Sequence, residues 1–543
     1  MFIPRRARRF FQRARLLFLL SSSALIFGCS RHEPPADLTI INSAEPESLD
    51  PAIVVAQVDL RVVQGLFEGL TRLEPTNSFA VPGLAEKWDI SPDGRIYTFH
   101  LRTNLVWSTG EPITADDVVY SWRRALDPKT ASTYAGQLYY IKNAEDFNTG
   151  KIKDPSLIGV KALDPLTVRV ELNSPTAFFL DLCAFPTLCI VPRQAIEKYG
   201  DHWLTHKPLP SDAAFQLESW RLNDKIRLVK NPRYWDATNT QANIIDLLPI
   251  ASPSTALNLY ESGEADLVLD KGLIPSELLD LLLQRPDFHK FSNLGTYFIR
   301  FNTTRKPFDD PRVRQALALV IDKERLVKKI TRGGEAITST IVPPGTKNYT
   351  PPAGLGYNVE LARKLLAEAG YPGGKGFPHF EYLFNGGASG GGEIHEGIAI
   401  ELQQMWSDAL GIHMSLRQVE TQVFWGMQAR MDFDLSKASW YGDYNDANTF
   451  LGMFSSGDGN NETGWSNPEY DRLIVAANST TDLKQREKLF QQAEKILLCD
   501  GTPIIPLYIY VGVNYFDTNK VTGLWQNILD NHPLRSLRKI NKK

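Results

Sequence analysis

Short apolar runs, most of which alternate with polar residues, recur along the chain and predict β-strands. The clearest are Leu38–Ala44, Ile96–Arg102, Leu166–Leu172 and Lys225–Asn231. Between them lie longer stretches whose apolar residues recur every three or four positions, which is the period of an amphipathic helix. Because such strands and helices alternate throughout, the pattern predicts an α/β fold.

Capping residues mark several of the predicted helices. Thr114 precedes Ala-Asp-Asp, which places a cap and first-turn acids at a helix start. Pro311 stands at the start of another helix, at the position where proline is favoured. Gly370, next to last in the stretch Val359–Tyr371, is a C-cap signal for a helix there. A late amphipathic helix is predicted over Arg486–Leu498.

The length of 543 residues is too great for one ordinary core and predicts two or three domains. The sequence shows no internal repeat and no long flexible stretch after residue 37. We therefore expect domains that interleave along the chain.

Residues 1–28 are predicted to be a secretory signal peptide. They hold six arginines and no acid, and their apolar run Leu16–Phe27 is shorter than the roughly 20 residues of a membrane span. Without them the chain has 53 Lys and Arg against 62 Asp and Glu, a formal charge of −9. Such an acidic chain argues against nucleic acid as a partner and favours ligands that carry an amine.

The apolar run leads into Gly28 and Cys29, and Ile-Phe-Gly-Cys resembles the lipobox of bacterial lipoproteins. The resemblance implies cleavage before Cys29, lipid on its sulfur and new amine, and a lipidated tether over residues 29–37. The alternative is a soluble secreted protein. Cys183 and Cys189 are either joined by a disulfide, which an oxidising compartment permits, or are buried free thiols.

The stretch SWYGDYNDANTF, Ser439 to Phe450, places Asp443 just past a strand-like run and beside Trp440, Tyr441 and Tyr444. A surface turn with no ligand role would explain the aspartates and asparagines, but not the aromatic residues. A carboxylate behind aromatic walls lies in a reduced dielectric, where it attracts a cation more strongly than at the surface. Asp443 is therefore a candidate ammonium-binding residue.

Eight sequence blocks resemble, in the same order, the oligopeptide- and dipeptide-binding proteins of ABC importers, which form solute-binding protein family 5. The blocks are Ser48–Ala52, Leu66–Leu70, Gly83–Trp122, Tyr234–Ala237, Asp309–Val327, Ala362–Tyr371, Asn467–Ile474 and Ile504–Tyr510. The resemblance covers about residues 38–540 and is strongest to the oligopeptide-binding proteins.

The resemblance implies the type II fold of periplasmic binding proteins, in which two lobes close on a ligand about a hinge. Carried over, the boundaries are residues 38–67, 193–294 and 510–540 for lobe I, 68–192 for an extra domain, and 295–509 for lobe II.

The resemblance also implies a set of ligand-binding residues. Asp443 would bind the peptide's ammonium, and Lys437 and His395 would be candidates for its carboxylate. Lys437 stands where relatives carry an arginine, and His395 follows a glycine-rich loop at a helix start, where anions are favoured. For both residues the alternative is a position without ligand contact, which for His395 is a solvent-facing helix surface.

The peptide backbone is expected to lie between two stretches of main chain, Ala438 to Trp440, including Ser439, and the three residues Val55, Ala56 and Gln57. Trp440, Tyr441 and Trp425 would form the side-chain pockets, although core packing is an equal alternative for Trp425.

The implied function is capture of short peptides and their delivery to membrane permease subunits with cytoplasmic ATPases. We expect a monomer with no cofactor and no enzymatic activity. Murein peptides, or a non-peptide cargo on the same fold, remain alternatives. Two rivals from other classes are weaker. A G-x-S-x-G match at Gly387–Gly391 would suggest a hydrolase, and His202 with His206 would suggest a metal site but lacks the glutamate of H-E-x-x-H.

Overall fold

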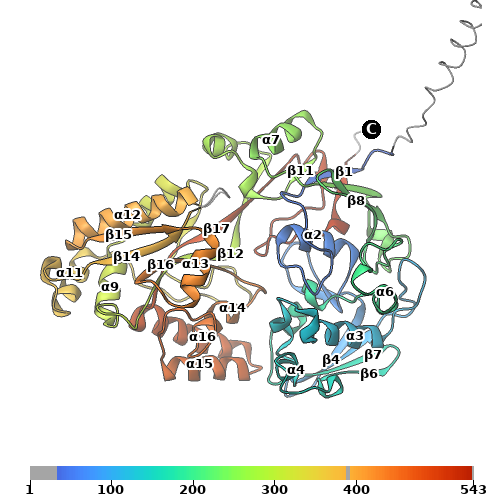
Figure 1. Ribbon diagram of the computed structural model, residues 1–543, viewed down its shortest axis with the longest axis horizontal. Coiled ribbons are helices and arrows are strands. Elements are labelled where there is room, and N and C mark those ends of the chain that lie inside the picture. Colours follow the sequence, from blue (N-terminus) through green and yellow to red (C-terminus); the bar gives the residue numbers. More distant parts are fainter. Residues whose placement is uncertain (1–32, 387–391, 541–543) are drawn as a thin grey trace, which may run out of the picture. The chain divides into compact units, whose positions relative to one another are not determined.

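The computed structural model describes residues 33–386 and 392–540 (Figure 1). The described residues from Asp37 onward form one compact unit. The signal peptide predicted for residues 1–28, the lipidation site predicted at Cys29 and the G-x-S-x-G match at 387–391 lie outside the described residues.

Eleven strands of the described chain form one mixed sheet. Along the sheet the order is β15 (Met414–Val419), β14 (Phe380–Asn385), β16 (Leu435–Tyr441), β12 (Phe288–Phe301), β17 (Ile504–Phe516), β11 (Leu267–Val268), β1 (Leu38–Ile41), β10 (Ile244–Leu248), β9 (Lys225–Lys230) and β8 (Phe215–Arg221). The short strand β13 (Ala336–Ile337) also pairs with β17.

The long antiparallel strands β12 and β17 connect the two ends of this sheet (Figure 1). On one side β12 pairs with β16, and on the other β17 pairs with β11. The register between the two long strands shifts between Ser292 and Thr296 of β12. The chain therefore passes from one end of the sheet to the other through two neighbouring strands.

A separate four-stranded antiparallel sheet has the order β4 (Ala85–Ile90), β5 (Ile96–Leu101), β7 (Thr167–Glu171) and β6 (Val160–Asp164). The alternation seen in the sequence of β5 is the burial pattern of a strand with one covered face. Two strand pairs complete the described sheets, β2 (Thr71–Leu73) with β3 (Ala80–Pro82) and β18 (Val521–Thr522) with β19 (Arg538–Lys539).

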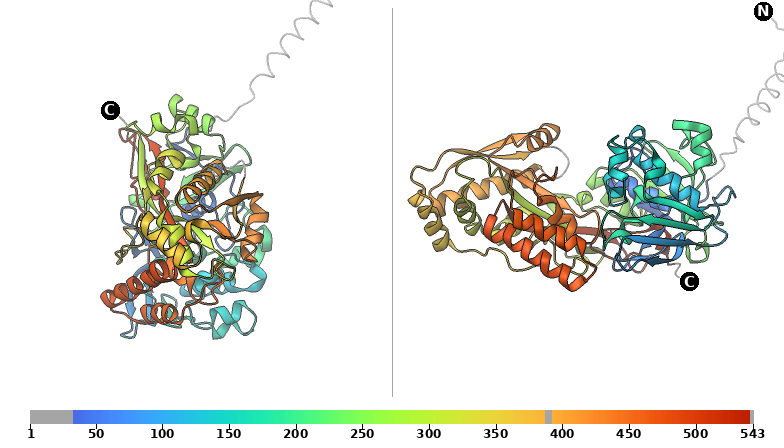
Figure 2. Two further views of the ribbon diagram at one scale, coloured as in Figure 1. Left: turned by 90° about the vertical axis from the view of Figure 1, so that its left-hand side faces the viewer. Right: turned by 90° about the horizontal axis from the view of Figure 1, so that it is seen from below.

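Helices pack around these sheets. Their bounds are α2 Gln57–Leu66, α3 Ala115–Leu126, α4 Ala144–Asn148, α5 Phe179–Leu182, α6 Arg193–Tyr199, α7 Pro253–Ser262, α8 Leu279–Leu282, α9 Pro311–Leu319, α10 Lys323–Leu326, α11 Val359–Glu368, α12 Gly392–Leu410, α13 Thr421–Ala429, α14 Asn448–Leu451, α15 Pro468–Ser479 and α16 Leu483–Lys495. Helices α15 and α16 lie side by side (Figures 1 and 2).

Two helix starts predicted from capping residues are confirmed. Thr114 caps α3, and its backbone N–H donates to Asp117 Oδ2 at 2.8 Å. Pro311 is the first residue of α9, as predicted. The late helix α16 begins earlier than predicted, because the Asp482 side chain accepts hydrogen bonds from the backbone N–H groups of Lys484 and Gln485.

Three large cores hold the structure together. The first core is built mainly from residues 38–269 and 516–537. Alternate residues of β12 enter the other two, since successive side chains of a strand point to opposite faces. Tyr297 and Ile299 lie in the second core, and Phe298 lies in the third.

Cys183 and Cys189 are buried free thiols in the first core. Burial raises the pKa of both thiols, which makes them unreactive. Of the two sequence alternatives, the free thiols are confirmed and the disulfide is wrong.

Candidate functional site

Asp443 lies two residues beyond the end of β16 and is half-buried. Its backbone N–H donates to Thr449 Oγ1 at 3.3 Å, and its carboxylate is hydrogen-bonded by the side chain of Gln137. Burial raises the pKa of the Asp443 carboxyl to about 6. Within the described residues no cationic side chain forms an ion pair with it, so at neutral pH it is a desolvated anion without a counter-charge.

Two glycines allow the chain to reach this position. The Gly442 N–H donates to Leu294 O at 2.8 Å, and a Cβ there would lie 2.6 Å from the Leu294 side chain. Gly295 pairs with Tyr441 across β12 and β16, and a Cβ there would lie 2.7 Å from the tyrosine ring. A Cβ at either position would force the neighbouring Leu294 or Tyr441 side chain to move.

Strand β16 has one edge that is largely unpaired. On one side β12 pairs with all of β16, from Leu435 to Tyr441. On the other side β14 pairs only with Leu435 and Ser436, and no other strand of the described chain takes over beyond that point. The Lys437 carbonyl is already used, because it accepts from Gln428 Nε2 at 2.8 Å. Ala438 to Tyr441 therefore offer an edge to which an extended ligand can add as a strand.

Lys437 is a buried cation at the start of this edge, with 5% of its surface exposed. Its Nζ lies 5.1 Å from the ring centroid of Phe424 and 5.5 Å from that of Trp425. No carboxylate of the described residues forms an ion pair with it. Burial, reinforced by the charge of Arg300, lowers the pKa of the Lys437 ammonium to about 8. Trp425 is 49% exposed, which rules out the core-packing alternative.

His395, near the start of α12, is half-buried. Its Nδ1 lies 3.4 Å from the hydroxyl of Tyr297. Burial and the charge of Lys437 lower the pKa of the imidazole to about 3, so His395 is neutral at pH 7. The solvent-facing alternative is therefore wrong, and His395 can meet a carboxylate as a hydrogen-bond donor but not as a cation.

The aromatic residues of SWYGDYN do not form one wall around Asp443. Tyr441 is 52% exposed and stacks on Tyr510, with ring centroids 4.7 Å apart. Ser439 is hydrogen-bonded to Tyr510 on the same face. Trp440 points to the opposite face, donates from Nε1 to Thr449 Oγ1 at 3.3 Å, and packs on the third core. Trp440 and Tyr441 therefore lie on opposite faces of β16, and Trp440 shares the Thr449 hydroxyl with the backbone of Asp443. Ligand contact by Trp440 stays a prediction.

Val55, Ala56 and Gln57 are exposed. Val55 and Ala56 precede α2, and Gln57 is its first residue, with its Nε2 donating to Asp530 O at 2.9 Å. The described structure pairs them with no strand. Their role on the second side of a peptide stays a prediction, which can involve an extended backbone only at Val55 and Ala56.

Several residues of the site were missed by sequence reasoning. Tyr510 carried a weak signal, because it ends the family-like block Ile504–Tyr510. Phe424, next to Trp425, carried a weaker one. Gln137 carried none, since only the folded chain brings it to Asp443.

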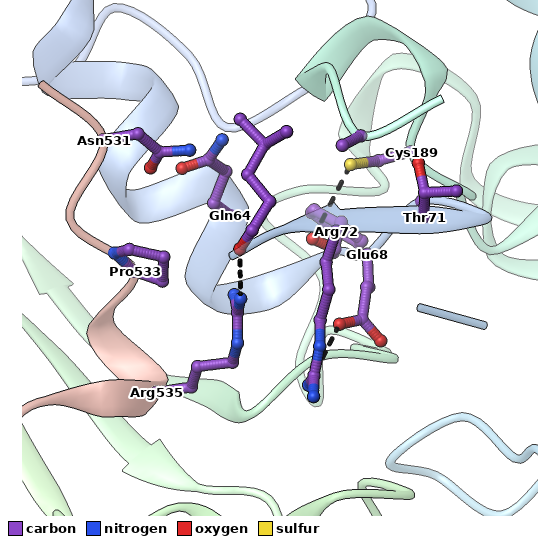
Figure 3. Close-up of a pocket in the computed structure, with 12 residues that line it drawn as sticks. Gln64, Glu68, Thr71, Arg72, Cys189, Asn531, Pro533 and Arg535 are labelled. Atoms are coloured by element: carbon purple, nitrogen blue, oxygen red, sulfur yellow. Dashed lines mark hydrogen bonds and ion pairs between the residues drawn. The ribbon is translucent and has the colours of Figure 1, made fainter. Parts of the chain in front are cut away.

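The small pocket in Figure 3 is a different place, lined among others by Glu68, Arg72, Cys189 and Arg535. Its volume of about 30 Å³ suits about two water molecules. None of the predicted ligand residues lines it. In the described ranges there is also no cluster of metal-ligating side chains, and His206 stacks on Tyr199. No helix there is both long and apolar enough to cross a membrane.

Comparison with known proteins identifies the family. Residues 80–462 match the model described as "Bacterial extracellular solute-binding proteins, family 5 Middle". The periplasmic oligopeptide-binding protein OppA of Salmonella typhimurium is 36% identical over 87% of this chain and 86% of its own length. The probable deoxycholate-binding periplasmic protein YgiS of Escherichia coli is 35% identical, covering 86% of each chain.

Among solved structures, the murein tripeptide binding protein MppA of Escherichia coli superposes with a TM-score of 0.76 at 33% identity. The match covers 93% of this chain and 98% of that one. The predicted fold class, the α/β type II fold of periplasmic binding proteins, is confirmed with it. The chain belongs to family 5 of the bacterial extracellular solute-binding proteins.

Proposed function

We propose that this protein is the substrate-binding component of an ABC importer and captures short peptides with free amino and carboxyl termini. One observation carries the proposal. Asp443 is an anion without a cation, Lys437 is a cation without a carboxylate, and an unpaired strand edge lies between them. An extended zwitterion with backbone amides satisfies all three, because it supplies both charges and a strand.

The spacing of the two charges limits the ligand length. Asp443 follows Lys437 by six residues, so their Cα atoms are at most ~20 Å apart at about 3.3 Å per residue. A peptide that meets both residues has about six residues or fewer, since it rises by the same amount per residue. Tyr441, Tyr510 and Trp425 offer aromatic surfaces that suit varied side chains.

The names of the relatives agree with a peptide cargo but include another. Salmonella OppA is named for oligopeptides and MppA for a murein tripeptide. YgiS is named as a probable deoxycholate binder. A bile acid has no ammonium and would leave Asp443 buried without a partner, so the charge pattern favours peptides.

The test is mass spectrometry of what acid releases from purified residues 30–543. Peptides of two to six residues are the expected result. A single species with cell-wall amino acids would narrow the function to murein peptides. A sterol acid, sugar or metal complex would overturn the peptide proposal while leaving the family membership intact.

The domain boundaries belong to the same proposal: lobe I at 38–67, 193–294 and 510–540, the extra domain at 68–192, and lobe II at 295–509. The long strands support this division, since the boundaries at 294/295 and 509/510 fall within β12 and β17, which connect the two ends of the sheet. Two adjacent strands crossing between lobes form a hinge about which the lobes can close.

We also propose that the mature protein is a monomer anchored through lipid on Cys29 and that it docks on permease subunits with associated ATPases. The support is the sequence Ile-Phe-Gly-Cys after the signal-like segment. Expressed in a bacterial host, the wild type should fractionate with membranes, and Cys29→Ser should be released in soluble form. Soluble wild-type protein with an unmodified Cys29 would contradict the anchor.

A further inference from the structure

Tyr444 carries the segment that follows β16 into the first core. Its side chain is 6% exposed, and its ring stacks on Phe178 with centroids 4.1 Å apart and planes 7° apart. Its hydroxyl lies 3.1 Å from the hydroxyl of Tyr140. Of the described residues between 295 and 509, Tyr444 alone belongs to that core. The Tyr444 side chain, which comes from the segment after β16, thus completes the packing of the first core.

A buried ion pair joins the same two parts of the chain. Lys347 Nζ lies 3.1 and 3.2 Å from the two carboxylate oxygens of Asp181, whose side chain is 2% exposed. The backbone N–H of Lys347 donates to Asn445 Oδ1 at 2.9 Å. Asn445 directly follows Tyr444, so the ion pair and the inserted tyrosine are held by one short segment.

Asp443 directly precedes Tyr444 and is affected by the same contact. Gln137, its hydrogen-bond partner, comes from the region that also supplies Tyr140 and Phe178. Seating Tyr444 therefore removes the Asp443 carboxylate from water, which is unfavourable while it is ionised and unpaired. A ligand ammonium beside Asp443 removes this penalty. Ligand binding and the seating of Tyr444 must then favour each other, because coupling free energies are reciprocal.

We propose that Tyr444 and the Lys347–Asp181 ion pair form a latch that closes residues 295–509 onto residues 68–192 and is completed when a ligand ammonium neutralises Asp443. The ligand's identity in this statement rests on the proposed function. Tyr444 is a positioning residue, because it acts on the ligand through its neighbour Asp443 and not by direct contact. Tyr444 is expected to affect mainly the dissociation rate of the ligand, because its contact forms after the ligand has first met the protein.

Stopped-flow measurement with trialanine tests the latch. Tyr444→Ala should raise the dissociation rate about 10- to 100-fold and change the association rate less than about threefold. Tyr444→Phe keeps the ring on Phe178 and should stay within about fivefold of the wild type. Tyr470→Leu is the control, because Tyr470 is also a buried tyrosine but lies in the third core. It should lower the melting temperature without faster release. Unchanged release in Tyr444→Ala, or equally fast release in Tyr470→Leu, would overturn the latch.

Hydrogen–deuterium exchange separates failure of the latch from failure of the peptide proposal. Saturating trialanine should slow exchange at residues 134–140 of the wild type and leave it unchanged in Tyr444→Ala. Binding without protection there would remove the latch and keep the peptide function. If trialanine does not bind, the peptide proposal fails, and the latch is then tested on the ligand-free proteins. The latch requires faster exchange at residues 134–140 in Tyr444→Ala than in Tyr470→Leu. Equal exchange in the two variants refutes the latch.

Discussion

Replacing Asp443 with asparagine is expected to weaken the binding of trialanine by about 2–5 kcal/mol, the loss typical when one partner of a buried charge pair is removed. The amide keeps the size of the side chain but not its charge, so the peptide ammonium is left desolvated and unpaired. Isothermal titration at pH 7 measures the change. N-acetyl-trialanine is the control ligand: it has no ammonium, so it should bind weakly to both proteins. Equal affinity of the wild type and Asp443→Asn for trialanine would remove the assignment.

The same interaction predicts a pH dependence. Asp443 has a raised pKa of about 6 and binds an ammonium only when ionised. Affinity should therefore fall as pH drops through 6, by about tenfold per unit as one proton is taken up. At alkaline pH it should fall above about 8, where Lys437 and the peptide's own α-amino group lose their charges. Asp443→Asn should lack the acid limb of this pH profile, that is, the loss of affinity below about pH 6.

Lys437→Met is the matched variant for the other end of the ligand. It should keep the acid limb, because Asp443 is intact, and lose the part of the alkaline limb that belongs to Lys437. If the acid limb persists in Asp443→Asn, the titrating group is another residue and the ammonium site is misplaced.

Asp443→Asn should also stabilise the ligand-free protein at neutral pH. A carboxyl group whose pKa is raised by folding favours the folded state while protonated, and this contribution is lost as pH rises from about 4 to about 6. Above that range the ionised side chain destabilises the fold, by about 1–2 kcal/mol after allowance for its partial exposure. Asparagine avoids this effect, so ligand affinity and ligand-free stability should change in opposite directions.

Much of the fold was visible in the sequence, and the reasons are local. The strands near Leu38, Ile96, Leu166 and Lys225 and the starts of α3 and α9 were predicted by alternation and capping, which depend on a few neighbouring residues. The pairing of β12 with β16 and β17 was not, because it joins segments far apart in the chain. The resemblance to a family implied a hinge between two lobes, but not this pairing.

The candidate site, too, could be predicted from the sequence only in part. Asp443 stood out because a carboxylate at a strand end beside aromatic residues is unusual, and the structure does bury it without a counter-charge. The roles of its neighbours could not be predicted, because the directions of the Trp440 and Tyr444 side chains are set by packing against distant parts of the chain. Similarly, the neutral state of His395 follows from burial beside Lys437, which no local pattern reveals.

The second large effect is expected at the ion pair that anchors the Asp443 segment. Asp446 and Arg486 are 4% and 5% exposed and are joined by two hydrogen bonds, of 2.6 and 2.8 Å. Arg486→Met should lower the free energy of unfolding by about 3–5 kcal/mol, because it leaves the Asp446 carboxylate buried without its counter-charge. Urea unfolding of the ligand-free protein measures this loss.

The double variant Asp446→Asn/Arg486→Met shows whether the pair acts through charge or through packing. If the uncompensated charge causes the loss, removing it as well should restore much of the stability, since a buried pair is often replaceable by neutral side chains. If the packing of the Arg486 side chain against Phe490 causes it, the double variant stays as unstable as the single one. Trialanine affinity then separates anchoring from stability. Asp446 lies three residues after Asp443, so a segment freed in the double variant would bind the peptide weakly even where the fold has recovered.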